Sequence, residues 1–442
     1  MTGGPAPASE HSGTPAPDGI PHDDLLSDAE ARALARATGA ARLTTLAGAE
    51  AAGDFRGGLQ GADARLIDRI GAQSCLAMGV LPLLPAGGAV PVATVRPHRF
   101  AMLRAWLTPL LGPVRMVIAT RDEVQDAILA IRARGLAQLS ETRVERSESC
   151  REWSPRRFAV MFAGLTLTAL TLAILKPALA FTLFAAWAVL TLVLTTALRT
   201  VAAIVQLRQR PAAPPPLPEL HDWPVVTLLV PLFDERAILS ELLGRLGRLD
   251  YPADRLDICL ILEEDDLVTR RALATSDMPP GVRRIIVPRG AVQTKPRAMN
   301  FALDFARGSI IGVYDAEDAP APDQLRRVAA RFAASGHDLA CVQGVLDFYN
   351  AETNWLSRCF AIEYAAWFRI ILPGLERMGL VLPLGGTTVF FRRAAIEALG
   401  GWDAHNVTED ADLGLRLARH GYRTEMMATV TEEEANCRLW PW

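Results

Sequence analysis

The chain has 442 residues, a length that suggests about three structural units at roughly 150 residues each. Hydrophobic residues make up 50% and charged residues 21%, and the mean hydropathy is +0.18, so part of the chain has to be strongly apolar. A net charge of −3, a pI near 6.2 and six cysteines without CxxC spacing argue against a nucleic-acid partner, a disulfide framework and a zinc module, and we expect reduced cysteines.

The first 150 residues predict a tail followed by a small domain. Residues 1–22 are rich in Pro, Gly, Ala and Ser and lack the pattern of a signal peptide, so we expect a disordered tail. Residues 23–150 have the pattern of a small α/β domain without a catalytic constellation. The predicted helices are 27–38, 99–111 and 121–134, and the predicted strands are 77–84, 89–95 and 114–119.

The apolar excess lies in residues 158–198, where Lys176 is the only charged residue. Lys176 and Pro177 interrupt this run, so we predict two helices, 158–175 and 178–198, each long enough for a bilayer core of about 30 Å. The alternative is a buried helical hairpin of a soluble protein. Arginines flank the run on both sides, and the positive-inside rule then places both neighbouring domains in the cytoplasm of a multi-pass protein of the bacterial inner membrane.

A Pro-rich linker, 209–224, leads into residues 225–442, where strand and helix patterns alternate. The predicted strands are 225–231, 256–262, 284–287 and 310–314, and the predicted helices are 236–249, 296–307 and 322–334. The alternation predicts an α/β fold with a largely parallel sheet covered by helices on both faces. In such sheets the ligand lies beyond the carboxyl ends of the strands.

Four acidic clusters fall at these strand ends or at a helix start: VPLFDE at 230–235, LEEDD at 262–266, YDAED at 314–318 and VTED at 407–410. Singly, each is typical of a solvated loop, and Thr408 followed by acids is ordinary helix-start chemistry. Together they would converge on one cleft, where gathered carboxylates need a cation or a raised pKa. Asp315 and Glu317 alternate on an extended segment and can share a hard cation. Because Lys295 and Arg297 begin a helix, the pattern predicts a metal-bound diphosphate.

In this order the motifs resemble those of the inverting, membrane-associated family 2 glycosyltransferases, in particular the cellulose-synthase-like branch. GGWD at 400–403 and EEEA at 432–435 are also similar. The resemblance implies a GT-A, Rossmann-like transferase domain that uses a nucleotide-diphospho-sugar, a UDP-sugar in particular, with Mg²⁺ or Mn²⁺, in exopolysaccharide or cell-surface glycan synthesis.

The resemblance assigns roles residue by residue. The metal would be held by Asp315 and Glu317, and the catalytic motif is Thr408, Glu409 and Asp410, with Asp410 as the base that takes the proton of an acceptor hydroxyl. The nucleotide-sugar would be bound by Pro231, Phe233, Asp234, Glu235, Glu263, Glu264, Lys295 and Arg297. Gly385, Gly386 and Thr387 lie on the acceptor side, where PLG at 383–385 departs from the family's Phe-Phe-Cys and leaves a glycan and a lipid-linked acceptor both open.

Residues 70–130 resemble the N-terminal domain of type II secretion ATPases, with GVLPLLP at 79–85. Some relatives of that domain bind cyclic di-GMP, but the Arg-x-Gly-rich motif is not evident, which favours a docking or regulatory module with a protein partner. The chain ends before the family's Gln-x-x-Arg-Trp motif, so we expect a C-terminally truncated chain. This departure, with Glu in place of Asp at several positions, leaves a rival hypothesis: a non-catalytic membrane adaptor with a degenerate transferase domain.

Overall fold

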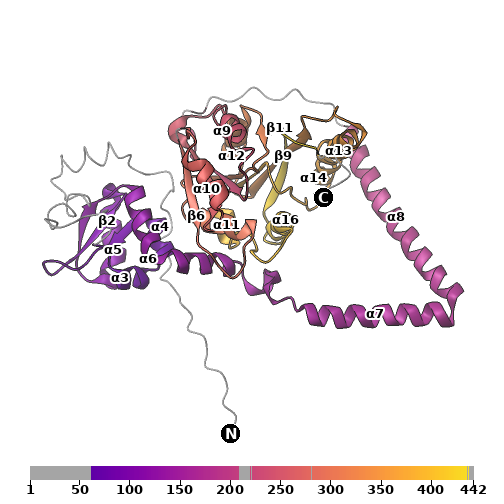
Figure 1. Cartoon of the computed structure of the whole chain (residues 1–442), viewed down its shortest axis with the longest axis horizontal. Helices are drawn as coiled ribbons and strands as arrows, with labels where there is room; N and C mark the ends of the chain where they lie inside the picture. Colours follow the sequence, from indigo (N-terminus) through magenta and orange to yellow (C-terminus); the bar gives the residue numbers. More distant parts are fainter. Residues whose placement is uncertain (1–60, 209–219, 221, 280, 436, 438–442) are drawn as a thin grey trace, which may run out of the picture.

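The computed structural model describes residues 61–442 apart from 209–219, 221, 280, 436 and 438–442. The predicted tail, the predicted helix 27–38 and most of the Pro-rich linker lie outside the described residues. The described chain runs through a small α/β unit, two long apolar helices and a larger α/β unit (Figure 1).

The small unit contains a three-stranded sheet in the order β1-β2-β3, with β1 antiparallel and β3 parallel to β2. Its strands are β1 (Val80–Pro82), β2 (Val90–Thr94) and β3 (Val114–Ile118), and its helices are α3 (Ala64–Ile70), α4 (Ala72–Met78), α5 (Phe100–Leu111) and α6 (Arg121–Thr142). The strand predicted at 77–84 begins later, because helix α4 runs to Met78 and ends at Gly79 in the left-handed conformation, φ 62°. Short 3₁₀ turns precede α5 and follow α6: η1 (Pro97–Arg99), η2 (Arg146–Glu148) and η3 (Cys150–Glu152).

Helix α6 is longer than predicted, since it continues past residue 134 to Thr142. A capping box starts it: the Thr120 side chain accepts from the Glu123 N–H, and the Glu123 carboxylate accepts from the Thr120 N–H at 2.7 Å. The extra turns carry α6 from the small unit to the larger one (Figure 1).

The apolar run forms α7 (Pro155–Leu175) and α8 (Pro177–Leu207), separated at Lys176 as predicted. Both helices are long and apolar enough to cross a membrane: the most apolar 18-residue window of each has a mean hydropathy of 2.2 and is 0% buried within the protein. They project away from both α/β units (Figure 1). Only the end of α8 packs closely on the larger unit, where a Cβ at Gly374 would meet the backbone of Ala202.

The larger unit is built on an eight-stranded sheet in the order β6-β5-β4-β7-β10-β9-β11-β8. Its strands are β4 (Val226–Leu232), β5 (Leu256–Glu263), β6 (Val282–Val287), β7 (Ile310–Val313), β8 (Ala319–Pro320), β9 (Leu339–Phe348), β10 (Val389–Arg392) and β11 (Arg423–Glu433). Strands β6, β5, β4 and β7 are parallel, but β10 is antiparallel to both β7 and β9. In the other half β11 is parallel to β9 and antiparallel to β8, so the sheet is mixed rather than largely parallel.

Helices cover both faces of this sheet: α9 (Leu239–Leu246), α10 (Leu267–Ala274), α11 (Lys295–Leu303), α12 (Gln324–Ala333), α13 (Trp355–Ala366), α14 (Leu372–Arg377), α15 (Arg393–Ala398) and α16 (Glu409–Arg419). A 3₁₀ turn, η4 (Ala253–Arg255), precedes β5, and a π-helical turn, η5 (Trp367–Ile371), joins α13 to α14. Alternation along β4 separates the two cores: Val226, Leu228 and Val230 pack with α9 and α12, and Leu229 packs on the face of α11.

The small unit is docked on the α11 face, and its apolar core is continuous with the core beneath α11. The Arg143 guanidinium pairs with Asp304 at 2.7 Å, and the Asn300 amide donates to the Ser140 carbonyl at 3.1 Å. Because Asn300 and Asp304 belong to or follow α11, the last turns of α6 rest directly on the helix that begins with Lys295.

Candidate active site

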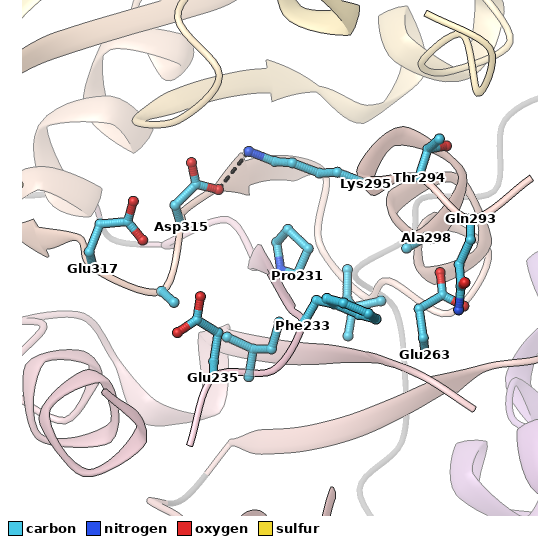
Figure 2. Close-up of a pocket in the computed structure, with 13 residues that line it drawn as sticks. Pro231, Phe233, Glu235, Glu263, Gln293, Thr294, Lys295, Ala298, Asp315 and Glu317 are labelled. Atoms are coloured by element: carbon cyan, nitrogen blue, oxygen red, sulfur yellow. Dashed lines mark hydrogen bonds and ion pairs between the residues drawn. The ribbon is translucent and has the colours of Figure 1, made fainter. Parts of the chain in front are cut away.

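A cavity of ≈ 370 Å³ opens at the carboxyl ends of β4, β5 and β7, where the sequence predicted a cleft (Figure 2). Its lining residues are Pro231, Leu232, Phe233, Glu235, Ile261, Glu263, Gln293, Thr294, Lys295, Ala298, Asp315, Ala316 and Glu317. In Figure 2, Glu235, Asp315 and Glu317 gather on one side, Glu263 and Gln293 lie on the opposite side, and Pro231 and Phe233 lie between them. We call these two sides the acidic end and the Glu263 end.

At the acidic end, three carboxylates face one ammonium group. Lys295 Nζ donates to Asp315 Oδ1 at 2.5 Å and to the Gly386 carbonyl oxygen at 3.1 Å. Burial lowers the pKa of Lys295, but the charge of Asp315 and its hydrogen bond, together with the charges of Glu409 and Asp318, outweigh burial and raise the pKa, so the ammonium stays charged. Burial, then repulsion from Glu317, raises the pKa of Glu235. This end therefore carries more negative than positive charge, which suits a bound cation.

The turn after β4 presents Glu235 to the cavity and leaves Asp234 exposed outside it. Asp234 has φ 57°, a left-handed conformation that Asp tolerates better than most residues. Its N–H donates to Asp266 Oδ2 at 3.0 Å, and the Glu235 N–H donates to Thr269 Oγ1 at 2.9 Å. The turn is thus tied to the start of α10.

The two adjacent glutamates at the end of β5 lie in different environments. Glu263 is 6% exposed and lines the cavity, and burial raises its pKa to about 7 although Arg297 opposes this shift. Glu264 is exposed, lies outside the lining, and accepts from the Arg289 N–H at 3.1 Å. Successive residues of an extended chain point in opposite directions, and this explains why the two adjacent glutamates differ.

The sequence predicted that Lys295 and Arg297 both bind a diphosphate, but only one of the two side chains lines the cavity. Lys295 lines the cavity, whereas Arg297 is 0% exposed and is absent from the lining. The Arg297 guanidinium lies between Glu263, at 3.3 Å, and Glu141 of α6, at 3.1 Å. Two positions apart on a helix, side chains project about 200° apart, so only one of the two can face the cavity.

Thr387, in the segment 385–387 predicted for the acceptor side, helps to hold the backbone of Asp315 in place. The Asp315 N–H donates to Asp318 Oδ2 at 2.8 Å and to Thr387 Oγ1 at 3.2 Å, and the Thr387 hydroxyl donates to the same Asp318 carboxylate. Thr387 is only 3% exposed, and burial raises the pKa of Asp318 well above its usual value. The Gly385 N–H donates to Gln343 Oε1 at 2.9 Å. Thr387 is therefore buried behind Asp315, and the partly buried Gly385 is fixed by its backbone hydrogen bond.

Thr408 occupies the position before α16, but its side chain makes no capping hydrogen bond. Its N–H and its hydroxyl both donate to Asn406 Oδ1, at 3.0 and 3.1 Å. The interpretation of this threonine as an ordinary N-cap was therefore wrong for the side chain. Glu409 is 8% exposed, and burial raises its pKa.

Asp410 lies next to the cavity across Gly386. A Cβ at Gly386 would lie 3.3 Å from Asp410 Oδ2 and 3.7 Å from Lys295 Nζ, so both groups approach the same glycine. Asp410 Oδ1 accepts from the Ala411 N–H at 2.7 Å, which leaves Oδ2 on the side of Gly386. Asp410 is not among the lining residues themselves.

Sequence reasoning missed Gln293, Thr294 and Ala298, which line the Glu263 end. Gln293 and Thr294 directly precede the KPRAMN run at 295–300 and Ala298 lies inside it, a position that could have indicated all three. Nothing in the local sequence pointed to Glu141, which reaches this end from the small unit. Among the described residues, no three His, Cys, Asp or Glu side chains are placed to hold a metal ion by themselves.

Residues 224–438 match the family model described as "Glycosyltransferase like family 2". A beta-monoglucosyldiacylglycerol synthase of Synechocystis sp. is 31% identical over 221 residues, 48% of this chain and 44% of that protein. The cellulose synthase 1 catalytic subunit (UDP-forming) of Komagataeibacter xylinus is 29% identical over 221 residues, 48% of this chain and 28% of that protein. The chain thus spans less than half the length of either relative.

Among solved structures, a mannosyltransferase from Pyrobaculum calidifontis in complex with GDP-Man and Mn²⁺ aligns with 56% of this chain and 68% of that chain, with a TM-score of 0.42 and 23% identity. The glucosyl-3-phosphoglycerate synthase of Mycobacterium tuberculosis, in complex with Mn²⁺ and UDP-glucose, aligns with 49% of this chain and 73% of that chain, with a TM-score of 0.32 and 19% identity.

Proposed function

We propose that residues 224–438 form a GT-A domain of glycosyltransferase family 2 and that this chain transfers a sugar from a nucleotide-diphospho-sugar to an acceptor hydroxyl with inversion. One observation carries the proposal: Lys295, which is paired with Asp315 and lines the cavity, and the Asp410 carboxylate both lie close to Gly386. This proximity supports a cation-binding group and a base that act on one reacting centre.

We place the nucleotide base of the donor at the Glu263 end of the cavity and the diphosphate at the acidic end. Glu263 and Gln293 supply polar groups for the nucleotide base, and the aromatic ring of Phe233 lies exposed between the ends. The diphosphate lies at the acidic end, where Lys295 is the charged donor in reach. We favour a uridine nucleotide, because a cellulose synthase relative of this domain is named as UDP-forming.

The acidic end fits Mg²⁺ or Mn²⁺. Asp315 and Glu317 offer only oxygen ligands, and burial, followed by repulsion from the neighbouring carboxylates, raises the pKa of Glu235 beside them. Two protein carboxylates are enough, since Mg²⁺ is commonly bound by one or two carboxylates together with substrate phosphates. When bound, the ion would neutralise charge on the departing diphosphate.

Asp410 takes the proton of the acceptor hydroxyl on Oδ2, the oxygen that faces Gly386. The acceptor oxygen then bonds to the anomeric carbon, and the bond from that carbon to the diphosphate oxygen breaks on the opposite side. The diphosphate leaves with the electron pair, which the Lys295 ammonium helps to stabilise.

We also propose that α7 and α8 cross the bacterial inner membrane, with both α/β units on the cytoplasmic side. Support comes from their length, the mean hydropathy of 2.2 of their most apolar 18-residue windows, their exposed apolar side chains and the flanking arginines. A membrane-held transferase suits a glycan or lipid-linked acceptor, in exopolysaccharide or cell-surface glycan synthesis. Residues 23–150 would serve as a docking or regulatory module, for a protein partner or cyclic di-GMP.

The test is Asp410→Asn in the full chain reconstituted in nanodiscs with Mg²⁺ or Mn²⁺. We expect UDP affinity to be retained and sugar transfer from UDP-sugars to fall by about 10²-fold or more, as loss of a general base usually causes. Asp122→Asn is the matched control, because Asp122 is also a first-turn helix acid but lies on α6. Equal turnover in both variants would reject Asp410 as the base, and no transfer by the wild type would favour the adaptor.

A further inference from the structure

The last turn of α6 belongs to the small unit, yet it forms part of the wall behind the cavity. Its Glu141 carboxylate pairs with Arg297 Nε at 3.1 Å. Arg297 Nη1 in turn lies 3.3 Å from Glu263 Oε2, and Glu263 lines the cavity. One fully buried guanidinium therefore links a residue of the small unit to the Glu263 end.

The same glutamate also holds the loop that leads into the cavity. Glu141 Oε1 accepts from the Ala291 N–H at 2.8 Å, two residues before Gln293 in the lining. A Cβ at Gly290 would collide with both the Glu141 carboxylate and the Arg297 guanidinium, so a glycine is needed for the loop to come this close. The Arg297 guanidinium also donates to the Pro288 carbonyl, which ties the start of the loop to the same group.

The backbone of Glu141 reaches the other side of the site. His405 Nε2 lies 3.1 Å from the Glu141 carbonyl oxygen, in the segment just before α16. The Thr294 hydroxyl donates to the Ala404 carbonyl at 2.8 Å, so the loop and this segment are also joined to each other. Glu141 thus touches both segments that border the Glu263 end.

The ion pair between Glu141 and Arg297 is buried, so breaking it costs more free energy than breaking an exposed pair. Removing one partner of a buried ion pair leaves an uncompensated charge, whereas an exposed pair contributes little. Without Glu141, the buried Arg297 has Glu263 as its remaining carboxylate, and the guanidinium is drawn toward the cavity. Asp122 of α6 also pairs with the larger unit, through Arg307 at 3.1 Å, but the Asp122 side chain is 72% exposed and neither residue lines the cavity.

We propose that Glu141 is a positioning residue for donor binding: through Arg297 and the Ala291 N–H, it holds Glu263 and the 288–294 loop where the nucleotide base binds. The small unit thereby sets donor affinity without contacting the donor. This inference rests on the proposed function, because it concerns the same cavity.

The first experiment compares Glu141→Gln with Asp122→Asn in the full chain in nanodiscs. Glutamine keeps the shape and can still accept from the Ala291 N–H, so the fold is expected to survive. We expect the Kd for UDP with Mn²⁺ and the donor KM to rise about 10-fold in Glu141→Gln, with kcat changed by less than about two-fold. Asp122→Asn should leave all three unchanged. An unchanged Kd in Glu141→Gln, or an equal loss in Asp122→Asn, overturns the inference.

A second experiment tests the route through Arg297. In an Arg297→Met background, adding Glu141→Gln should weaken UDP binding by less than about two-fold further. The effects of two substitutions are not additive when one residue acts through the other. A full additional loss would overturn the route.

A third readout does not depend on the proposed function. If wild type binds no nucleotide, the proposed function fails, and the positioning role is decided by amide hydrogen exchange of residues 288–294. Faster exchange in Glu141→Gln but not in Asp122→Asn supports the role, and unchanged exchange overturns it.

Discussion

The acidic end of the cavity is built by the large unit alone, whereas the Glu263 end depends on a residue of the small unit. Asp315 is held by Asp318 and Thr387, both in the same sheet domain, and its charge is met by Lys295. Glu263 shares Arg297 with Glu141, which lies in α6. Chemistry at the acidic end can therefore follow from local motifs, but affinity at the Glu263 end depends on how two units are docked.

The largest effect is expected at the acidic end. Asp315→Ala removes one of the two carboxylates proposed for the cation and leaves Lys295 without its 2.5 Å partner. We expect cation-dependent UDP binding to weaken by at least ~100-fold, because the diphosphate loses a bridged counter-charge. Calorimetry with and without Mn²⁺ measures this loss, and thermal unfolding checks that the variant is folded. Unchanged cation-dependent binding would contradict the metal assignment.

A smaller effect is expected at the Glu263 end, where two adjacent glutamates form a matched pair. Glu263→Gln should weaken UDP binding about 10-fold, because a buried, charge-assisted partner of the nucleotide base and of Arg297 is lost. Glu264→Gln should change it less than about two-fold, because that side chain is exposed and lies outside the lining. If both variants lose UDP affinity equally, lining the cavity does not distinguish the glutamate that binds the nucleotide.

The smallest effect is expected at Glu376, a partly buried glutamate that does not line the cavity and so shows what burial does without nucleotide binding. Burial raises the pKa of Glu376 in α14 to about 7, as for Glu263, but Glu376 lies outside the cavity and accepts from the Met426 N–H at 3.1 Å. Because its folded pKa is above the unfolded value of 4.5, the native state binds the extra proton, and stability falls as pH rises between these values.

Glu376→Gln cannot ionise, so it should be more stable than wild type by about 1–2 kcal/mol at pH 8, with the gain shrinking toward pH 5. UDP affinity should not change. Thermal unfolding across pH, with calorimetry at pH 8, tests both statements. A gain that is the same at every pH would show that ionisation of Glu376 is not its cause.

Lys295 and Arg297 show most clearly where prediction from sequence stopped. The helix start that carries them could be recognised from the KPRAMN run, and α11 does begin at Lys295. Which of the two faces the cavity depends on the rotation of the helix, and that rotation is set by its packing against the sheet and α6. Arg297 is buried only because Glu141 arrives from 156 positions earlier in the chain.

Features that depend on local pattern could be predicted from the residues alone. Hydropathy and the Lys176–Pro177 interruption predicted α7 and α8, and short apolar runs followed by acids predicted β4, β5 and β7 with their polar ends. Such signals lie within about twenty neighbouring residues and need no knowledge of distant partners.

The remaining features depend on contacts between residues that are far apart in the chain. The antiparallel insertion of β10 made the sheet mixed, burial turned Thr387 into a support for Asp315, and docking of α6 gave Arg297 its second carboxylate. These outcomes depend on which distant groups meet when apolar faces are buried, and a buried charge takes whichever opposite charge the packing brings to it.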